Sequence, residues 1–274
     1  MIALKLAAIP AVVWLASWAG RRWGHRVSGL ISGFPLISGP VLLFVAADAT
    51  PAFVAEASFT TMAAAPSVGV HCLVYSWMAR VTRASRWQWV ICLLAAWAGC
   101  VGASVLLSGM VIPGPIGLAL SIAEMLVLAA LMPRVRAHVG IPGIPPTEIV
   151  VRMLAALLVA AAVMFGAEAF GPRVSGILLA FPITASVLPV FTLALYGADA
   201  TVRLLSGFVT GLLGFVAYFF VFGALVRAHG IALACGAGVL ASLAMVSAAV
   251  AVQRRLARTE ASAGEGSDPG SASR

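Results

Sequence analysis

Two ionisable side chains lie inside long apolar stretches, where they could carry protons. Glu124 occurs in IGLALSIAEMLVLAALM and His71 occurs in APSVGVHCLVY. A charged carboxylate is costly in an apolar environment, so we expect Glu124 to face the interior of a helix bundle and to hold a proton readily. An imidazole can relay protons near neutral pH. Both residues are candidate coupling groups, and the alternative for each is a core group hydrogen-bonded to a neighbouring helix.

A repeated motif supplies the second set of candidates. The stretch GHRVSGLISGFP at 24–35 returns as GPRVSGILLAFP at 171–182, with seven of twelve positions identical. Each copy places an arginine, hydroxyl groups and a Phe-Pro pair at the start of an apolar segment. The candidate solute-binding residues are Arg26, Ser28, Ser32, Phe34, Pro35, Arg173, Ser175, Phe181, Pro182 and Thr184.

The prolines of these segments should leave backbone carbonyls without their usual helical donors, because proline has no N–H. The pairs of proline and freed carbonyl are Pro35 with Ile31, Pro182 with Leu178, Pro40 with Leu36, and Pro189 with Ala185. Such carbonyls are tolerated at membrane depth only where protein or water satisfies them. Broken helices at matching positions of inverted halves indicate the central site of a transporter. The alternative is a kinked helix that packs closely on its neighbours.

The elements that must position these residues are apolar helices. The chain has 274 residues, of which 62% are hydrophobic and 9% charged, and its mean hydropathy is +1.07. Soluble domains carry about 25% charged residues, whereas apolar runs of about 20 residues suit a bilayer. We therefore predict an all-α, polytopic membrane protein with nine spans, at about 2–20, 28–47, 52–79, 87–108, 111–132, 147–169, 174–196, 202–226 and 231–252.

The basic residues predict the orientation of these spans. With the N-terminus outside and the C-terminus in the cytoplasm, inside segments hold fourteen of the 17 basic residues, and outside segments hold only Lys5, Arg173 and Arg227. This separation follows the positive-inside rule. Arg173 defies the rule, so it is either an interfacial residue that caps a helix end or one of a pair of gate residues with Arg26.

The two motif copies should have opposite orientations, because an odd number of predicted spans separates them. The sequence ADAT also ends the predicted spans at 28–47 and 174–196, so the match extends beyond the motif. We predict an inverted 4+1+4 repeat. Its parts are a first four-helix repeat at 1–110, a connector helix and cytoplasmic loop at 111–146, a second, inverted repeat at 147–253, and a disordered cytoplasmic tail at 254–274.

The stretch RVSGLISGFPLISG, following a first helix, resembles the GlpM-type family of small bacterial membrane proteins. This resemblance covers about fifteen residues in each half and implies two four-span units fused through the span at 111–132, in the bacterial inner membrane. The inverted arrangement is also similar to that of the drug/metabolite transporter superfamily, which has five plus five spans.

A secondary transporter of a small polar or anionic solute, with its site near the bilayer midplane, is the function these patterns favour. A non-transporting scaffold or accessory subunit for envelope assembly is the alternative. An enzyme is not expected, because His71 and Glu56 would lie roughly 22 Å apart on one helix. We expect no metal or other cofactor. The expected partners are the lipid bilayer and a small solute, with a homodimer as an option and no nucleic acid.

Overall fold

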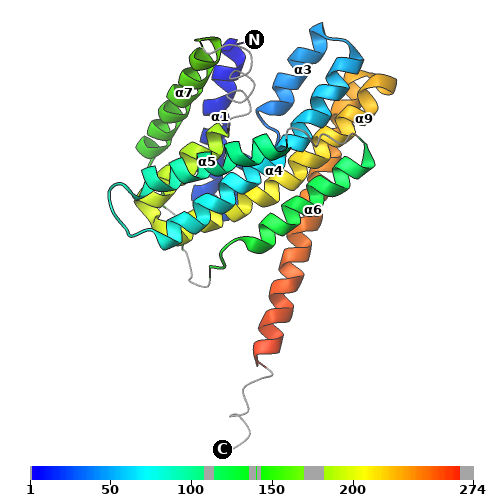
Figure 1. Cartoon of the computed structure of the whole chain (residues 1–274). Coiled ribbons are helices and arrows are strands. Elements are labelled where there is room, and N and C mark those ends of the chain that lie inside the picture. Colours follow the sequence, from blue (N-terminus) through cyan, green and yellow to red (C-terminus); the bar gives the residue numbers. More distant parts are fainter. Residues whose placement is uncertain (1, 108–113, 136–139, 141–142, 170–181, 266–274) are drawn as a thin grey trace, which may run out of the picture.

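The computed structural model describes residues 2–107, 114–135, 140, 143–169 and 182–265, and these residues form helices and connecting turns without any strand. The prediction of an all-helical chain is therefore confirmed for the described residues. The helices are α1 (Ile2–Trp23), α2 (His25–Gly33), α3 (Ser38–Asp48), α4 (Pro51–Val81), α5 (Gln88–Leu107), α6 (Pro115–Leu131), α7 (Pro146–Ala169) and α9 (Ile183–Glu265) (Figure 1).

Helix α9 is three helical segments joined at two kinks. Gly197 has φ 81° and Gly230 has φ 77°, and both values lie in the region that L side chains rarely adopt. Glycine has no Cβ and enters this region without steric penalty. The chain thus turns at these two positions, which divide α9 into segments 183–196, 198–229 and 231–265.

The middle segment of α9 runs antiparallel to α4 at the centre of the bundle, as the long yellow and cyan helices of Figure 1 show. Near one end of the pair, Arg80 forms an ion pair of 2.7 Å with Asp199. Near the other end, Arg227 donates to the carbonyl of Ala52 at 3.4 Å. One core cluster joins these two helices to α5 and α6 through Met62, Cys72, Cys92, Met125 and Phe219.

The break between α2 and α3 lies at the first Phe-Pro pair. Pro35 lacks the N–H that would bond to the carbonyl of Ile31, and the N–H of Phe34 donates to this carbonyl at 3.2 Å instead. The N–H of Gly39 then bonds to the carbonyl of Pro35 at 2.8 Å and starts α3. The segment predicted as one span at 28–47 is therefore two short helices that meet at 34–37.

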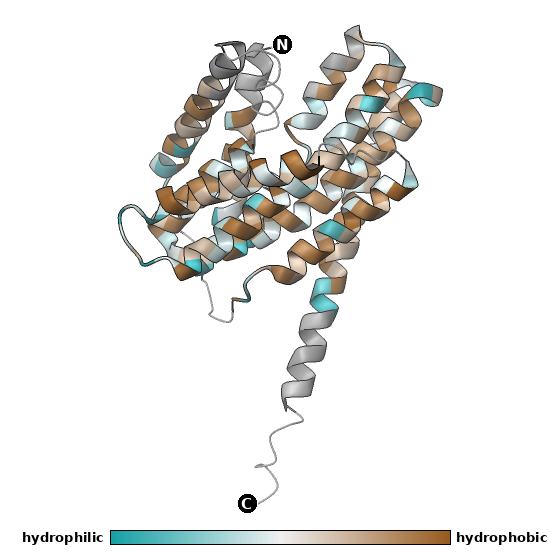
Figure 2. Ribbon diagram, viewed as in Figure 1, coloured by the Kyte–Doolittle hydropathy of each residue, from teal (hydrophilic) through white to brown (hydrophobic). Residues whose placement is uncertain are grey.

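Three helices among the described residues are long and apolar enough to cross a membrane, namely Pro51–Val81, Gln88–Leu107 and Ile183–Arg255. Figure 2 shows hydrophobic colours along the outer faces of the helices, with most of the hydrophilic colour near helix ends and in loops. Large apolar side chains such as Leu94, Leu106, Leu158 and Leu240 are exposed on these faces. This surface fits a membrane protein.

The C-terminal tail differs in part from the prediction of disorder. Helix α9 continues to Glu265 and extends away from the rest of the bundle, so residues 254–265 are helical (Figure 1). The sequence QRRLARTEASAGE is rich in alanine, arginine and glutamate and holds no proline, so a helix that has already formed can extend through it. The remaining residues of the tail, 266–274, lie outside the described residues.

Candidate functional site

The first copy of the motif is buried in the bundle on one face of α2. Ser28 is 2% exposed and Ser32 is 6% exposed, and the Ser32 hydroxyl donates to the Ser28 carbonyl at 2.9 Å. Phe34 and Pro35 are partly buried at the break. The two serines therefore face a neighbouring helix, while the hydroxyl of Ser32 is occupied by its own helix.

The glycines of this copy permit very close helix packing. A Cβ built on Gly29 would lie 1.7 Å from the carbonyl oxygen of Leu204, and one on Gly33 would lie 2.3 Å from that of Phe208. On the facing segment of α9, a Cβ on Gly207 or Gly211 would likewise lie within 2.3 Å of an α2 carbonyl oxygen. Two GxxxG pairs thus interlock, which is the helix contact expected of such small residues in a membrane.

The second copy of the motif is described only from Pro182 onward. Arg173, Ser175 and Phe181 lie outside the described residues. Pro182 is buried, Thr184 is 8% exposed, and α9 begins immediately after the proline, at Ile183.

The described residues around the two Phe-Pro pairs share one apolar cluster. It contains Ile31 and Ile37 from the first break and Ile183, Val187 and Leu188 from the start of α9. The two segments thus belong to one apolar cluster, which also includes residues of α1 and α7.

His71 of α4 satisfies one of the carbonyls that a proline leaves free. Its Nε2 lies 3.0 Å from the carbonyl oxygen of Ala185, the acceptor freed by Pro189. Since a carbonyl only accepts, Nε2 carries the proton in this bond, and the backbone of Ala96 in α5 also lies next to the ring. The predicted alternative for His71, a core histidine bonded to a neighbouring carbonyl, is what the structure contains.

Within the part of the chain that the structure describes, two buried polar atoms beside this bond have no hydrogen-bond partner. They are Nδ1 of His71 and the hydroxyl of Tyr75, one helical turn further along α4, and both residues are 0% exposed. The two rings lie 6.3 Å apart, centroid to centroid. Buried polar groups are nearly always paired, with protein or with ordered water. An acceptor and a donor are thus available in the core.

A third polar contact borders these atoms. The indole N–H of Trp97 in α5 donates to the hydroxyl of Ser186 at 3.0 Å, and Ser186 directly follows Ala185. Sequence reasoning missed Tyr75, Trp97 and Ser186 as a group. The proline at 189 marked the acceptor on α9 and His71 was a candidate of its own, but nothing in the sequence paired the two or marked Trp97 of α5 as a donor.

Glu124 does not face the interior of the bundle as predicted. The buried residues of α6 are Gly117, Ser121, Met125 and Leu128, and Glu124 is only partly buried at the edge of this stripe. It makes no hydrogen bond or ion pair with the described residues. The reason is the helical period, since positions 117, 121, 125 and 128 form one face and 124 lies beside it.

A buried ionic network at the start of α7 was not among the predicted sites. Arg152, 1% exposed, forms an ion pair of 2.5 Å with Glu148, which also accepts from the Tyr196 hydroxyl at 2.7 Å. The imidazole of His25 lies 5.1 Å from the Tyr196 ring, centroid to centroid. The i,i+4 spacing of Glu148 and Arg152 was the available signal. The network joins α7 to α9 and to the start of α2.

His25 lies beside this network, at the junction of α1 and α2. Burial, followed by the charges of Arg152 and Arg203, lowers the pKa of His25 to about 4. The imidazole is therefore neutral at physiological pH.

Comparison with known proteins does not identify the chain: no family model, no curated protein and no solved structure matches it. Within the described residues, no group of three or more His, Cys, Asp or Glu side chains is placed to hold a metal ion. The resemblance to GlpM-type proteins and to drug/metabolite transporters thus stays a prediction.

Proposed function

We propose that the chain is a secondary transporter of a small polar or anionic solute in the bacterial inner membrane. In this proposal nine spans form the inverted 4+1+4 repeat, with the N-terminus outside and the C-terminus in the cytoplasm. The solute site lies between α4 and the first turns of α9, next to the second Phe-Pro pair.

The observation that carries the proposal is the pair of unpartnered polar atoms on α4. His71 Nδ1 accepts and the Tyr75 hydroxyl donates, so a bound molecule with one donor and one acceptor satisfies both. Water has this pattern, and so do the hydroxyl, amide and protonated carboxyl groups of small solutes. In a region where every polar group needs a partner, such a pair favours a bound polar molecule.

The broken helices support a change of access to this site. The break at 34–37 and the start of α9 at Ile183 belong to segments packed in one cluster. A short helix that ends at a break has few backbone hydrogen bonds to lose when it tilts, unlike a continuous span. We propose that α2, α3 and the first segment of α9 move against the rigid pair formed by α4 and residues 198–229.

The coupling role proposed for His71 differs from that of Glu124. Since Nε2 is engaged by Ala185, a proton can enter the ring only at Nδ1. Binding of solute and binding of a proton would then compete for one atom. Glu124, at the edge of α6, would serve only if a proton path ran along that helix.

Solute flux into proteoliposomes tests the proposal. The probe is a panel of labelled sugars, amino acids, carboxylates and phosphate, measured with and without a pH gradient. We expect at least one solute of the panel to enter the proteoliposomes faster than it enters empty vesicles. Tyr75→Phe should slow the entry of that solute by about tenfold, because the acceptor group of the bound solute loses the buried hydroxyl donor. Folding should not suffer, since the deleted hydroxyl bonds to no described residue.

The matched control is Tyr218→Phe, another core tyrosine whose hydroxyl lies 3.7 Å from the sulfur of Cys235, away from His71. It should leave flux unchanged. Entry no faster than into empty vesicles across the whole panel would contradict the proposal, and so would equal slowing by the two variants.

The alternative function, a membrane scaffold or accessory subunit, is favoured by one observation. Helix α9 continues beyond the bundle to Glu265, where it is available to a partner (Figure 1). Stable co-purification with an envelope enzyme, together with an absence of flux, would support this alternative over transport.

A further inference from the structure

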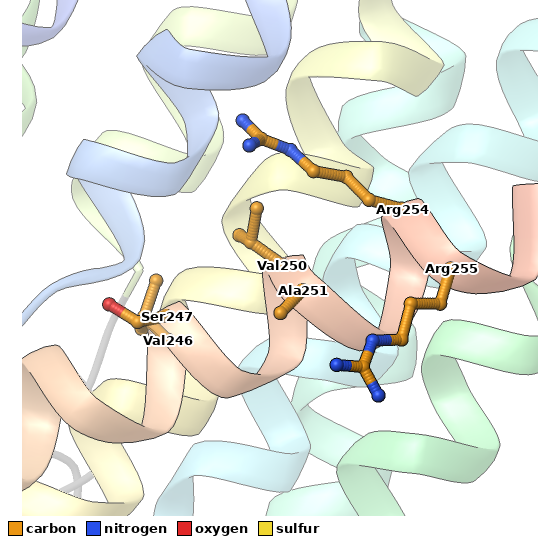
Figure 3. A pocket seen from close by; sticks show the side chains of 6 residues that line it. All are labelled: Val246, Ser247, Val250, Ala251, Arg254 and Arg255. Atoms are coloured by element: carbon orange, nitrogen blue, oxygen red, sulfur yellow. The ribbon is translucent and has the colours of Figure 1, made fainter. Parts of the chain in front are cut away.

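The last segment of α9 carries a pocket with two chemically different parts. The pocket has a volume of about 450 Å³ and is lined by Val246, Ser247, Val250, Ala251, Arg254 and Arg255. The apolar residues come first along the helix and the two arginines come last. Figure 3 shows the arginine side chains leaving the helix in different directions at one end of the pocket.

Further positive charge gathers around this end. Arg26 of α2 donates to the side-chain oxygen of Gln253, next to Arg254 in the sequence. Burial lowers the pKa of Arg26, and the nearby charges of Arg203 and Arg254 lower it further. The guanidinium groups of α2 and α9 thus lie close enough to repel one another.

The acidic side chains that the structure describes do not neutralise Arg26 or Arg254. Glu148 is engaged by Arg152 and Tyr196, and Asp199 is engaged by Arg80. Neither Arg26 nor Arg254 forms an ion pair within the part of the chain that the structure describes. Clustered arginines without acidic partners favour an external anion, and phosphate suits guanidinium groups through charge-assisted hydrogen bonds.

The apolar part of the pocket decides which phosphate compound fits. A free phosphate ion gains nothing from Val246 and Val250, whereas a phospholipid places an acyl chain against them and its phosphate at the helix end. Basic pockets beside membrane helices on the cytoplasmic side commonly hold anionic head groups. The fourteen-to-three charge distribution of the sequence predicts that this end of α9 is cytoplasmic.

We propose that this pocket binds an anionic phospholipid of the cytoplasmic leaflet, with the phosphate on Arg254 and an acyl chain along Val246 and Val250. Ser247 lies within the same pocket, one turn before Ala251, and offers a hydroxyl to the glycerol region. The proposal is independent of the solute site, because it requires no transport.

Native mass spectrometry of the detergent-purified full chain tests the proposal. Dioleoyl phosphatidylglycerol and dioleoyl phosphatidylcholine are titrated separately, and the first should bind at least about tenfold more tightly. Arg254→Gln/Arg255→Gln should lower the phosphatidylglycerol affinity by about 25-fold, since each arginine near a membrane surface contributes about a factor of five. Both residues are exposed, so these substitutions should leave the melting temperature in detergent unchanged.

The matched control is Arg83→Gln/Arg86→Gln, which removes the same charge from the exposed loop between α4 and α5. It should retain the wild-type affinity. A second variant, Val250→Trp, keeps every charge but fills the pocket, and it should also weaken lipid binding by severalfold.

Three results would overturn the proposal. Equal binding of the two lipids would remove the requirement for an anionic head group. An equal loss of phosphatidylglycerol affinity in Arg254→Gln/Arg255→Gln and in Arg83→Gln/Arg86→Gln would show that the effect depends only on net charge. If millimolar inorganic phosphate displaces the lipid, and Val250→Trp binds the lipid as tightly as the wild type does, the pocket is a site for a soluble anion.

Discussion

The contact between α2 and the middle segment of α9 makes the stability of the bundle depend on Gly29. In Gly29→Ala, the new methyl carbon would start 1.7 Å from the backbone oxygen of Leu204, whereas ordinary contacts are 3.4 Å or longer. The obstacle is backbone and cannot rotate away, so the two helices must separate by more than about 1 Å. Overpacking costs typically about 1–3 kcal/mol, and this geometry places the substitution near about 3 kcal/mol. For a chain of this size the corresponding fall in Tm is roughly 5–10 °C.

Two helical glycines in open space provide the control. A Cβ on Gly102 of α5 or on Gly236 of α9 would meet nothing within 4 Å. Each alanine substitution there should be neutral or should stabilise by up to about 1 kcal/mol, since alanine favours a helix over glycine. Unfolding by sodium dodecyl sulfate in mixed micelles, followed by circular dichroism, measures all three variants. If the free energy of unfolding of Gly29→Ala lies within about 0.5 kcal/mol of that of the two control variants, the interlocked packing is refuted.

Further predictions concern the other buried contacts. In His71→Phe the freed carbonyl of Ala185 loses its donor, so the free energy of unfolding in the same micelle assay should fall by about 1–3 kcal/mol; an unchanged value would exclude this hydrogen bond. Glu148→Gln strands the buried guanidinium of Arg152 and should cost about 3 kcal/mol, whereas the double variant Glu148→Met/Arg152→Met should recover at least half of the loss; no recovery would argue against the pair. His25 is neutral in the folded state with a pKa of about 4, against 6.5 when unfolded, so the unfolded chain binds the proton first and stability should decline from about pH 6.5 down to pH 4. His25→Asn should flatten this decline, as melting curves at successive pH values will show; a decline as steep as that of the wild type would contradict the lowered pKa.

The helical character and the position of the first break were predictable from the sequence because both follow from local chemistry. Apolar runs of about 20 residues specify helices in a membrane, and Pro35 removes a hydrogen bond wherever it lies. The GxxxG pattern at Gly207–Gly211 is likewise typical of close helix packing. Its partner helix was not predictable, since small residues permit close contact with any neighbour that presents them.

The candidate site shows where local reasoning stops. Pro189 identified Ala185 as an acceptor that needs a donor, and the structure supplies His71 from 114 positions away. That pairing depends on the register between α4 and α9, which is set by the whole bundle. Glu124 shows the same limit, because a shift of one position along α6 decides between the buried stripe and its edge.

The sequence also does not reveal which arginines lie close together in the folded chain. The number and spacing of the arginines predicted an orientation in the membrane, but not their neighbours in space. Arg26 and Arg254 are 228 positions apart in sequence and act on each other electrostatically. The pocket at the end of α9 therefore emerged only from the structure.

Water access to Ser186 is the most direct test of the proposed site. In a variant whose four native cysteines are replaced, Ser186→Cys is treated in proteoliposomes with a small, membrane-impermeant methanethiosulfonate reagent applied to either side. The transport proposal predicts modification from at least one side, slowed by the transported solute. A cysteine that stays unreactive from both sides while the protein remains folded would contradict the central claim, that the polar pair on α4 lines a site open to water.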